Sequence, residues 1–353
     1  MTGPDPQPDD QPAPRRRRLR PDASAGPTLA EVAARAGVSE ITVSRVMRGA
    51  GNVSAATEAR VREAVRETGY VRNRLAGSLA GHRSNQIGVL LPSLGNIVFP
   101  DVLNGIEDSL EARGFHPVLG ITHYQPEREE HLLASLLAWR PAGLIVTGTR
   151  HSAATRAMLG AGGVPVVEVM DVDTPPVDMA VGISHRAAGA AMARHLIGRG
   201  YRRFGYVGHD LGADERAAQR RDGFRHALAT AGLPEAQECL SGTPSSVGAG
   251  RAALAQLLER ARPEAVFFSN DDMATGGVFH CLAAGISLPG DLAIAGFNGL
   301  EIGQQLPQPL TTIGSRRRDI GRRAADMILA RLAGETPDPV ADVGFTLIPG
   351  ATA

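Results

Sequence analysis

The sequence lacks, or has few of, several residue types and patterns, and these absences exclude some classes of protein. Lysine is absent from the 353 residues, so arginine supplies the basic side chains other than histidine. The two cysteines, Cys239 and Cys281, form no CxxC pair, which argues against a metal cage or a disulfide scaffold. No stretch approaches the roughly 20 apolar residues of a membrane span. The first 27 residues lack the apolar segment of a secretory signal, so we expect a cytoplasmic protein.

Common catalytic motifs are missing as well. The sequence contains no HExxH, GxSxG or GxxxxGK[ST] pattern. GAGRAA at 248–253 matches a dinucleotide-binding fingerprint, but the TPSSV before it is not a strand, which that fingerprint requires. Asp271 and Asp272 are adjacent, so at a strand end they would point in opposite directions and could not form an acid/base pair. We expect no enzyme, no cofactor and no metal site, and an enzyme with unrecognised chemistry is the alternative.

The net charge is zero, but the charge is unevenly distributed. Residues 28–83 hold nine arginines against five glutamates, which makes nucleic acid a candidate partner for that segment. Residues 1–27, with PRRRRLR at 14–20, are too poor in apolar residues to pack, so we expect a disordered arm. Its arginines either touch DNA or remain solvated.

Three short helical patterns follow within residues 28–72. Each has an N-cap candidate, and two of them end at a glycine suited to a helix C-terminus. The first pattern also carries a capping-box signature. The capping residues are Thr28 with Glu31, then Ser39 and Ser54, and the terminating glycines are Gly37 and Gly69.

The spacing of the first two patterns predicts a helix-turn-helix. Ala33 is small where two crossing helices would touch, Gly37 suits the tight turn, and Val43 would anchor the second helix in the core. A plain helical hairpin is the alternative. The inward-facing residues of the second helix would be Val38, Val43, Val46 and Met47.

In a helix-turn-helix the second helix enters the major groove by its N-terminal residues. Glu40, Ile41 and Arg45 are the base-reading candidates, because these side chains suit a cytosine amino group, a thymine methyl and guanine, respectively. Other outward residues would contact phosphates and set the register. These are Ser39, Thr42, Ser44, Arg48 and Arg62.

After Gln86 the pattern changes to short apolar runs separated by helical stretches. The runs include IGVLLP, GLIVTG, VPVVEVM, RFGYVG, AVFFSND and LAIAGFN. Such runs are typical of parallel strands buried on both faces. We therefore predict an α/β core over 87–353, in which a ligand binds beyond the carboxyl ends of the strands.

The segments TLAEVAARAGVSEITVSRVMRG and TGYVRNRLAGSLAG resemble the DNA-binding head of the LacI/GalR family of bacterial repressors. The resemblance continues to about residue 350. Within the family, IGVLLPSLGNIVFPDVLNGIE, SNDDMATGG, LAIAGFNGLEIGQ and DVGFTLIPG are most similar to the gluconate-utilisation repressors. The resemblance implies an α/β protein with an N-terminal helix-turn-helix headpiece and a hinge helix, followed by a two-lobed core like a periplasmic binding protein. The first lobe would comprise about 87–184 and 313–338, and the second about 185–312 and 339–353.

The resemblance also implies a hinge helix within 73–86 that forms only on operator DNA. Leu79 would then wedge into the minor groove, and Arg74 is a further DNA-contact candidate. Gly77 and Gly81 make this helix marginal alone, so its ordering would be coupled to DNA binding. A passive linker is the alternative.

A small-molecule effector between the lobes is a further implication. Arg220 is the principal candidate, because a guanidinium can grip a carboxylate or vicinal hydroxyls with two hydrogen bonds. Arg150 and Arg216 add positive charge and favour an anion such as an aldonate or its phosphate, although each could instead form a surface ion pair. The full candidate set is Ser93, Val98, Phe99, Thr147, Arg150 and Asp171 from the first lobe, with Arg216, Arg220, Asn270, Asp271 and Asn298 from the second.

These implications predict a homodimer that reads a pseudo-palindromic operator in double-stranded DNA. The protein would repress sugar-acid catabolism until gluconate or a phosphorylated aldonate releases it. A regulator of another sugar or nucleoside pathway, a corepressor-dependent regulator and a sugar-binding protein without a DNA function are the alternatives.

Overall fold

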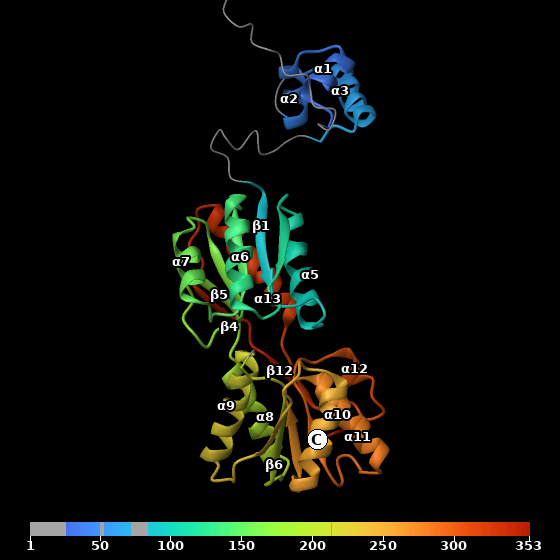
Figure 1. Ribbon diagram of the computed structural model, residues 1–353, viewed down its shortest axis with the longest axis vertical. Helices are drawn as coiled ribbons and strands as arrows, with labels where there is room; N and C mark the ends of the chain where they lie inside the picture. The colour runs from blue at the N-terminus through green and yellow to red at the C-terminus, as the bar shows by residue number, and fades with distance from the viewer. Residues whose placement is uncertain (1–25, 50–52, 72–83, 213) are drawn as a thin grey trace, which may run out of the picture. The chain divides into compact units, whose positions relative to one another are not determined.

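The computed structural model describes residues 26–49, 53–71, 84–212 and 214–353. The chain divides into two compact units, Met1–His82 and Arg83–Ala353 (Figure 1), and each is described by itself. Most of the expected N-terminal arm lies outside the described residues, as do Arg74 and Leu79 of the expected hinge helix.

The described residues of the first unit form three helices: α1 (Leu29–Ala36), α2 (Glu40–Arg48) and α3 (Ala55–Thr68). The predicted caps are confirmed. Thr28 and Glu31 make both hydrogen bonds of a capping box, and the Ser39 and Ser54 hydroxyls accept from backbone N–H groups in the first turns of α2 and α3. These bonds satisfy donors that a helix N-terminus otherwise leaves unpaired.

The predicted contact between the first two helices is also confirmed. Val43 is fully buried, and Ala33 is 5% exposed in the same cluster. Gly37 follows α1 with a φ of 65°, a left-handed conformation that costs glycine little. Val38, Val46 and Met47 join this core as expected, so the opposite side of α2 faces solvent.

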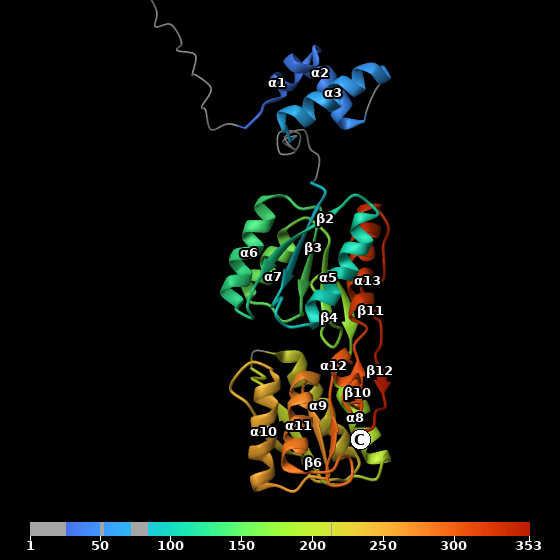
Figure 2. The ribbon, with the colours of Figure 1, turned by 90° about the vertical axis from the view of Figure 1, so that its right-hand side faces the viewer.

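The second unit contains two lobes, each built on a parallel sheet (Figure 1). The first lobe's sheet has the strand order β11-β5-β4-β3-β1-β2. Its strands are β1 (Gln86–Leu91), β2 (His116–Ile121), β3 (Gly143–Thr147), β4 (Val166–Asp171), β5 (Met179–Ile183) and β11 (Val340–Asp342). Figure 2 shows α5 (Val98–Glu111) and α13 (Arg317–Leu332) on one side of this sheet, and α6 (Pro126–Ala138) and α7 (Ala153–Ala161) on the other.

The second lobe's sheet has the order β7-β6-β8-β9. Its strands are β6 (Phe204–Gly208), β7 (Gln237–Leu240), β8 (Ala265–Phe268) and β9 (Ala293–Ala295). Its helices are α8 (His185–Gly198), α9 (Glu215–Thr230), α10 (Val247–Arg260), α11 (Asp271–Ala284) and the short α12 (Glu301–Gln304). A two-stranded antiparallel ribbon pairs β10 (Thr312–Gly314) with β12 (Thr346–Ile348).

The chain passes between the lobes three times: between β5 and α8, between β10 and α13, and between β11 and β12. The last passage differs from the boundary expected at residue 338. Val340–Asp342 pairs in parallel register with Ala180–Gly182, so the first lobe extends through Asp342. The chain then returns to the second lobe, where the Thr352 hydroxyl donates to the Ile294 carbonyl.

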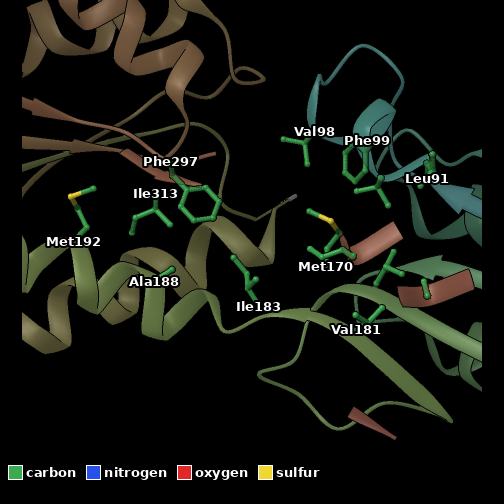
Figure 3. Packing of buried hydrophobic residues seen from close by; sticks show 14 of the residues in the cluster. Leu91, Val98, Phe99, Met170, Val181, Ile183, Ala188, Met192, Phe297 and Ile313 are labelled. Atoms are coloured by element: carbon green, nitrogen blue, oxygen red, sulfur yellow. The ribbon is translucent and has the colours of Figure 1, made fainter. Parts of the chain in front are cut away.

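A single buried apolar cluster runs through both lobes. Figure 3 shows its members on the two sides of the passage between the lobes, with Phe99 and Met170 from the first lobe and Phe297 and Ile313 from the second. The two lobes therefore share one hydrophobic core where they meet.

Three helix pairs cross closely at glycines. These are α5–α13 with Gly105 and Gly321, α8–α9 with Gly189 and Gly223, and α10–α11 with Gly250 and Gly276. A Cβ atom at any of these glycines would lie 1.9–2.1 Å from a carbonyl oxygen of the partner helix. Gly250 belongs to the GAGRAA segment, which lies inside α10, so its glycine serves helix packing.

Candidate nucleic-acid interface and effector cleft

The first turns of α2 expose the side chains predicted to read bases. Ile41 is 63% exposed, and Glu40 and Arg45 are exposed beside it. Arg45 forms no ion pair with any residue that the structure describes. An exposed isoleucine next to exposed charged side chains on a short helix suits a contact surface better than a solvated face.

The phosphate candidates occupy more varied positions. Ser39 is exposed but is engaged as the N-cap of α2, and Thr42 and Ser44 are half-buried. Arg48 ends α2. Arg62 lies on α3, where its Nη2 is 2.6 Å from Glu58 Oε1, so DNA would have to compete with this exposed ion pair.

Two adjoining cavities of about 510 and 580 Å³ lie between the lobes of the core, and Tyr124 and Asp214 line both. The larger one, called cavity B here, is lined by three of the predicted effector residues: Ser93, Asn270 and Asn298. The smaller one, cavity A, is lined by four others: Thr147, Arg150, Asp171 and Arg216. These residues follow strand ends, as expected for an α/β sheet.

Arg220 lines neither cavity; it contacts Asn270, which lines cavity B, and is 3% exposed. Its Nη2 donates to the Ser269 carbonyl at 3.0 Å and lies 3.4 Å from Asn270 Oδ1. Its guanidinium carbon is 4.0 Å from the centre of the Phe297 ring. Burial lowers the pKa of Arg220, and no carboxylate among the described residues forms an ion pair with it. A buried cation without a carboxylate partner calls for an anion.

His185 connects Arg220 to the first lobe. Its Nδ1 lies 3.0 Å from Arg220 Nη1, and its Nε2 lies 2.9 Å from the Met170 carbonyl oxygen. Since the arginine can only donate, Nδ1 accepts and Nε2 carries the proton. Burial and the charge of Arg220 hold the pKa of His185 well below its usual range, so the ring is neutral.

Asp171 makes a hydrogen bond across the cleft. Its Oδ2 accepts from Gln219 Nε2 at 2.9 Å in the second lobe, and from the Thr149 hydroxyl at 3.1 Å in the first. Asp171 is 2% exposed and Gln219 is 4% exposed. Asp171 therefore lies at the cleft, and its carboxylate forms a buried hydrogen bond between the two lobes.

Four buried atoms of α9 have no hydrogen-bond partner among the described residues. They are Arg216 Nη1, Gln219 Oε1, Arg220 Nε and Arg221 Nε. The Nη atoms of Arg221 already pair with Asp222 and Glu238, which leaves the first three atoms for a ligand. Of these, the Arg216 and Arg220 atoms can only donate, and the glutamine oxygen can only accept. Buried polar atoms are rarely left unpaired, so this stretch of α9 can take a ligand with two acceptors and one donor.

Asp271 faces away from the cleft. Its Oδ1 accepts from the Thr312 hydroxyl at 2.7 Å, and its Oδ2 accepts from the Leu300 backbone N–H at 2.7 Å. Burial raises its pKa to about 6, although these hydrogen bonds oppose the rise. Asp272, which was not a candidate, lines cavity B and accepts from Ser245. The two adjacent carboxylates point in different directions, as expected, but Asp272 and not the candidate Asp271 reaches the cleft.

Val98 and Phe99 lie behind the cleft surface rather than on it. Val98 is 6% exposed and Phe99 is 1% exposed, and neither lines a cavity described above. The guanidinium carbon of Arg216 lies 5.4 Å from the centre of the Phe99 ring. Phe99 thus supports an arginine of the cleft, although it does not present its ring to a ligand in this arrangement.

The positive charge expected from Arg150 and Arg216 is locally balanced. Arg150 is largely exposed and lies 3.9 Å from Glu215, and Arg216 lies 3.5 Å from Asp214. Burial would raise the pKa of Asp214, but Arg216 and His209 lower it well below its usual range, so it is ionised. Arg220, by contrast, has no carboxylate partner among the residues that the structure describes.

Glu129 and His151 line cavity A and form a buried charge cluster with Glu168 behind them. His151 Nδ1 lies 2.6 Å from Glu129 Oε1, and its Nε2 lies 3.3 Å from Glu168 Oε1. Burial lowers the pKa of His151, but the two carboxylates more than offset this effect and raise the pKa to about 9. The imidazole is thus a cation held between two glutamates at neutral pH.

Ser269, His209 and Asp214 meet in the order of a hydrolytic triad. His209 Nδ1 lies 3.0 Å from Ser269 Oγ, and its Nε2 lies 3.3 Å from Asp214 Oδ2. Ser269 is fully buried, however, and its hydroxyl also donates to Met273 Sδ. A nucleophile must reach its substrate, so these residues support the cleft wall instead.

Sequence reasoning missed several residues of the cleft. Tyr124 follows β2, and the rule for strand ends would have found it had β2 been identified. Asp214 lies in the loop after β6, a strand that was predicted, so the same rule pointed to its loop. His185 and Gln219 carry no such signal, because their role depends on contacts with the other lobe. The missed residues are Tyr124, Thr149, His185, Asp214, Gln219 and Asp272.

Comparison with known proteins agrees with this architecture. Residues 28–73 match the model for bacterial regulatory proteins of the lacI family, and residues 193–353 match a periplasmic binding protein-like domain. The transcriptional regulator GntR of Pseudomonas aeruginosa is 42% identical over 325 residues, which cover 91% of this chain and 94% of that protein.

Two solved structures extend the comparison to three dimensions. A LacI-family transcriptional regulator from Silicibacter pomeroyi is 44% identical, covers 92% of this chain and 98% of its own, and superposes with a TM-score of 0.88. The lac repressor dimer bound to operator and the anti-inducer ONPF is 27% identical, covers 93% and 99%, and has a TM-score of 0.82.

A helix-turn-helix unit joined to a two-lobed core with a ligand cleft defines a ligand-responsive DNA-binding regulator. This chain belongs to the LacI family of bacterial regulatory proteins, and it is a sequence-specific DNA-binding transcriptional regulator. LacI-family regulators bind operator DNA and small-molecule effectors and form dimers, and the relatives of this chain are regulators rather than enzymes. None of the helices that the structure describes could span a membrane.

Proposed function

We propose that this regulator is a dimeric repressor of sugar-acid catabolism, and that an aldonate of the gluconate type binds between its lobes and releases it from its operator. The observation that carries the ligand class is Arg220, a buried guanidinium without a carboxylate partner among the described residues. A carboxylate ligand would supply the missing counter-charge and an acceptor for the unpaired Arg220 Nε.

The unpaired atoms of α9 support a hydroxy acid in particular. A carboxylate offers acceptors to Arg220 Nε and Arg216 Nη1, and a neighbouring hydroxyl can donate to Gln219 Oε1. Gluconate carries a carboxylate next to a hydroxyl-bearing carbon and has further hydroxyls along its chain. Those hydroxyls can donate to the carboxylates that line the cavities.

The lining also favours gluconate over its phosphate. Its ionisable side chains include six carboxylates, from Glu129, Asp171, Asp210, Asp214, Glu215 and Asp272, against two arginines, the cationic His151 and His209. A second anionic group would face this excess of negative charge, whereas hydroxyls would find acceptors. We therefore place the unphosphorylated aldonate first and 6-phosphogluconate second.

A matched pair of arginines tests the ligand site. Arg220→Ala should abolish the thermal shift that gluconate produces and its effect on operator binding, while operator binding without ligand persists. Arg221→Ala is the control, because Arg221 is half-buried on the same helix and its Nη atoms already pair with Asp222 and Glu238. A normal response from Arg220→Ala would show that the site is wrongly placed.

Operator titrations with and without saturating gluconate determine the sign of the response. Weaker binding in gluconate is expected for an inducer, whereas tighter binding would mean a corepressor. A panel of aldonates, their phosphates and neutral sugars in the same assay tests the ligand class. If no aldonate changes operator affinity, the proposed effector is wrong.

On the DNA side, we propose that Glu40, Ile41 and Arg45 read bases, and that Arg74 and Leu79 act in a hinge segment over 73–86. One short helix contacts few base pairs, so two headpieces would be needed to read a pseudo-palindrome. Sedimentation with operator DNA should give a dimer. A stable monomer on DNA at micromolar concentration would contradict this assembly.

A further inference from the structure

Arg317, the first residue of α13, contacts both lobes of the core. Its Nη1 donates to the backbone carbonyl of Asn298 in the second lobe. Its Nε donates to Asp101 Oδ2 at 2.8 Å in α5 of the first lobe. The Arg317 side chain is only 13% exposed, so its planar guanidinium holds these two partners at a fixed separation.

The Asn298 end of this contact is conformationally strained. Asn298 has a φ of 114°, which is unusual for a residue with a side chain. Two further bonds hold it: its backbone N–H donates to the Ile313 carbonyl at 2.8 Å, and its Nδ2 donates to Asn270 Oδ1 at 3.0 Å. A strained backbone persists when its surroundings over-determine it, and Arg317 supplies part of that constraint.

Asn298 is connected through Asn270 to Arg220, the proposed carboxylate-binding residue. The Asn270 oxygen that accepts from Asn298 also lies 3.4 Å from Arg220 Nη2. A ligand that moves the guanidinium of Arg220 would alter its hydrogen bond to Asn270 Oδ1. The hydrogen bond that Asn298 donates to the same oxygen would then be affected. The contacts therefore run without a gap from Arg220 through Asn270, Asn298 and Arg317 to Asp101.

The Asp101 end joins a rigid part of the first lobe. Asp101 lies in the first turn of α5, which follows the Ser93–Ile97 loop at the rim of cavity B. Further along, α5 and α13 meet at Gly105 and Gly321 with no room for a Cβ atom. Helices in such contact move together, so a displacement at Arg317 is passed to both.

We propose that Arg317 is a positioning residue that couples occupancy of the cleft to the first lobe through Asn298 and Asp101. The ligand in this inference rests on the proposed function, whereas the contacts do not. When the lobes close on a ligand, either the Arg317–Asn298 hydrogen bond breaks or α5 and α13 move together with the second lobe. Because Arg317 makes the bond in question, the free energy of closure depends on Arg317 in both cases.

The next residue supplies a matched control. Arg318 also pairs with an aspartate of α5, with its Nη2 2.8 Å from Asp108 Oδ2. Among the described residues, its side chain makes no hydrogen bond or ion pair with the second lobe. Arg318→Gln therefore removes the same kind of ion pair from the same helix pair and leaves the contact between the lobes intact.

The first experiment measures operator affinity of the full-length dimer with and without saturating gluconate. Coupling in allosteric proteins is typically about 5- to 150-fold, and Arg317→Gln should reduce the measured ratio by at least about threefold. Arg318→Gln should leave the ratio unchanged. Asp101→Asn should reproduce the loss and add little to Arg317→Gln, because both variants break the same connection.

The second experiment needs no ligand, so it tests the contacts even if gluconate is not the effector. Hydrogen exchange of the free protein should be faster at the Asn298 and Leu300 amides in Arg317→Gln than in the wild type or in Arg318→Gln. Unchanged exchange at both amides, or equal acceleration in the two variants, would overturn the proposal. A wild-type protein indifferent to gluconate would refute the effector but not this connection.

Discussion

The carbonyl oxygen of Arg220 lies 1.9 Å from the point that a Cβ atom would occupy at Gly189. This contact between α8 and α9 fixes the backbone of the proposed carboxylate-binding residue. Gly223, about one turn after Arg220 on α9, makes the second close contact of this helix pair. The helix crossing therefore positions the Arg220 side chain.

Gly189→Ala should therefore damage both stability and ligand binding. Forcing a methyl group against the backbone of α9 should lower the free energy of unfolding by about 1–3 kcal/mol and shift Arg220. Gly198→Ala is the control, because a Cβ atom there would meet nothing within 4 Å on the same helix. Urea unfolding and a gluconate titration of both variants measure the two effects, and equal behaviour of the variants would contradict the packing argument.

Arg45→Ala should weaken binding to the correct operator by about 1–3 kcal/mol and relax preference at one base pair. Arg48→Ala and Arg62→Ala should weaken specific and random DNA alike, with Arg62 affected less because its guanidinium pairs with Glu58. Anisotropy titrations on operator, single-base variants and random DNA separate these cases. Equal losses on operator and random DNA for Arg45→Ala would remove its base-reading role.

His151 should make the core less stable as the solution becomes alkaline. Its pKa in the folded protein is about 9, above the value near 6.5 of an unfolded chain, so its stabilising effect is full below pH 6.5 and is lost as pH rises through 9. The whole effect is on the order of 3 kcal/mol, as an upper bound for a buried pair. Urea unfolding from pH 6 to 9.5 should show a steeper loss in the wild type than in His151→Gln. Parallel curves would mean that the imidazole is not charged in the fold.

His185 should make the core less stable as the solution becomes acidic. Burial and Arg220 hold its folded pKa well below 6.5, so its stabilising effect is full above that value and is lost as pH falls below it. His185→Gln can keep an acceptor toward Arg220 and a donor toward Met170, and its stability should depend less on acid. Long-range proton–nitrogen spectra of the wild type at pH 6 should show a neutral ring protonated at Nε2. A protonated ring at that pH would refute the assigned contact with Arg220.

The features predictable from sequence were those that depend on neighbours along the chain. Thr28, Ser39 and Ser54 cap helices through backbone groups three residues away, and apolar runs such as 143–147 form strands because both faces are buried. The positions of Asn270 and Asn298 at the cleft follow from the same logic, since each comes just after a strand.

Features that depend on distant partners could not be predicted in this way. β11 is three residues long, and only its pairing with β5 identifies it as a strand of the first lobe. The roles of Asp271 and Asp272 depend on side-chain directions at the start of α11, set by Thr312 and Ser245 from elsewhere in the chain. The neutral state of His185 similarly requires knowledge that Arg220 lies beside it.

The late position of α13 and β11 in the chain has a consequence for synthesis on the ribosome. The first lobe lacks α13, which covers α5 and three strands of its sheet, until the second lobe has almost been made. The headpiece, by contrast, completes its core within residues 29–70. Because domains fold as they emerge, the DNA-binding part of this regulator can mature long before the part that senses ligand. Chains interrupted before α13 would then carry a folded headpiece without a complete sensor.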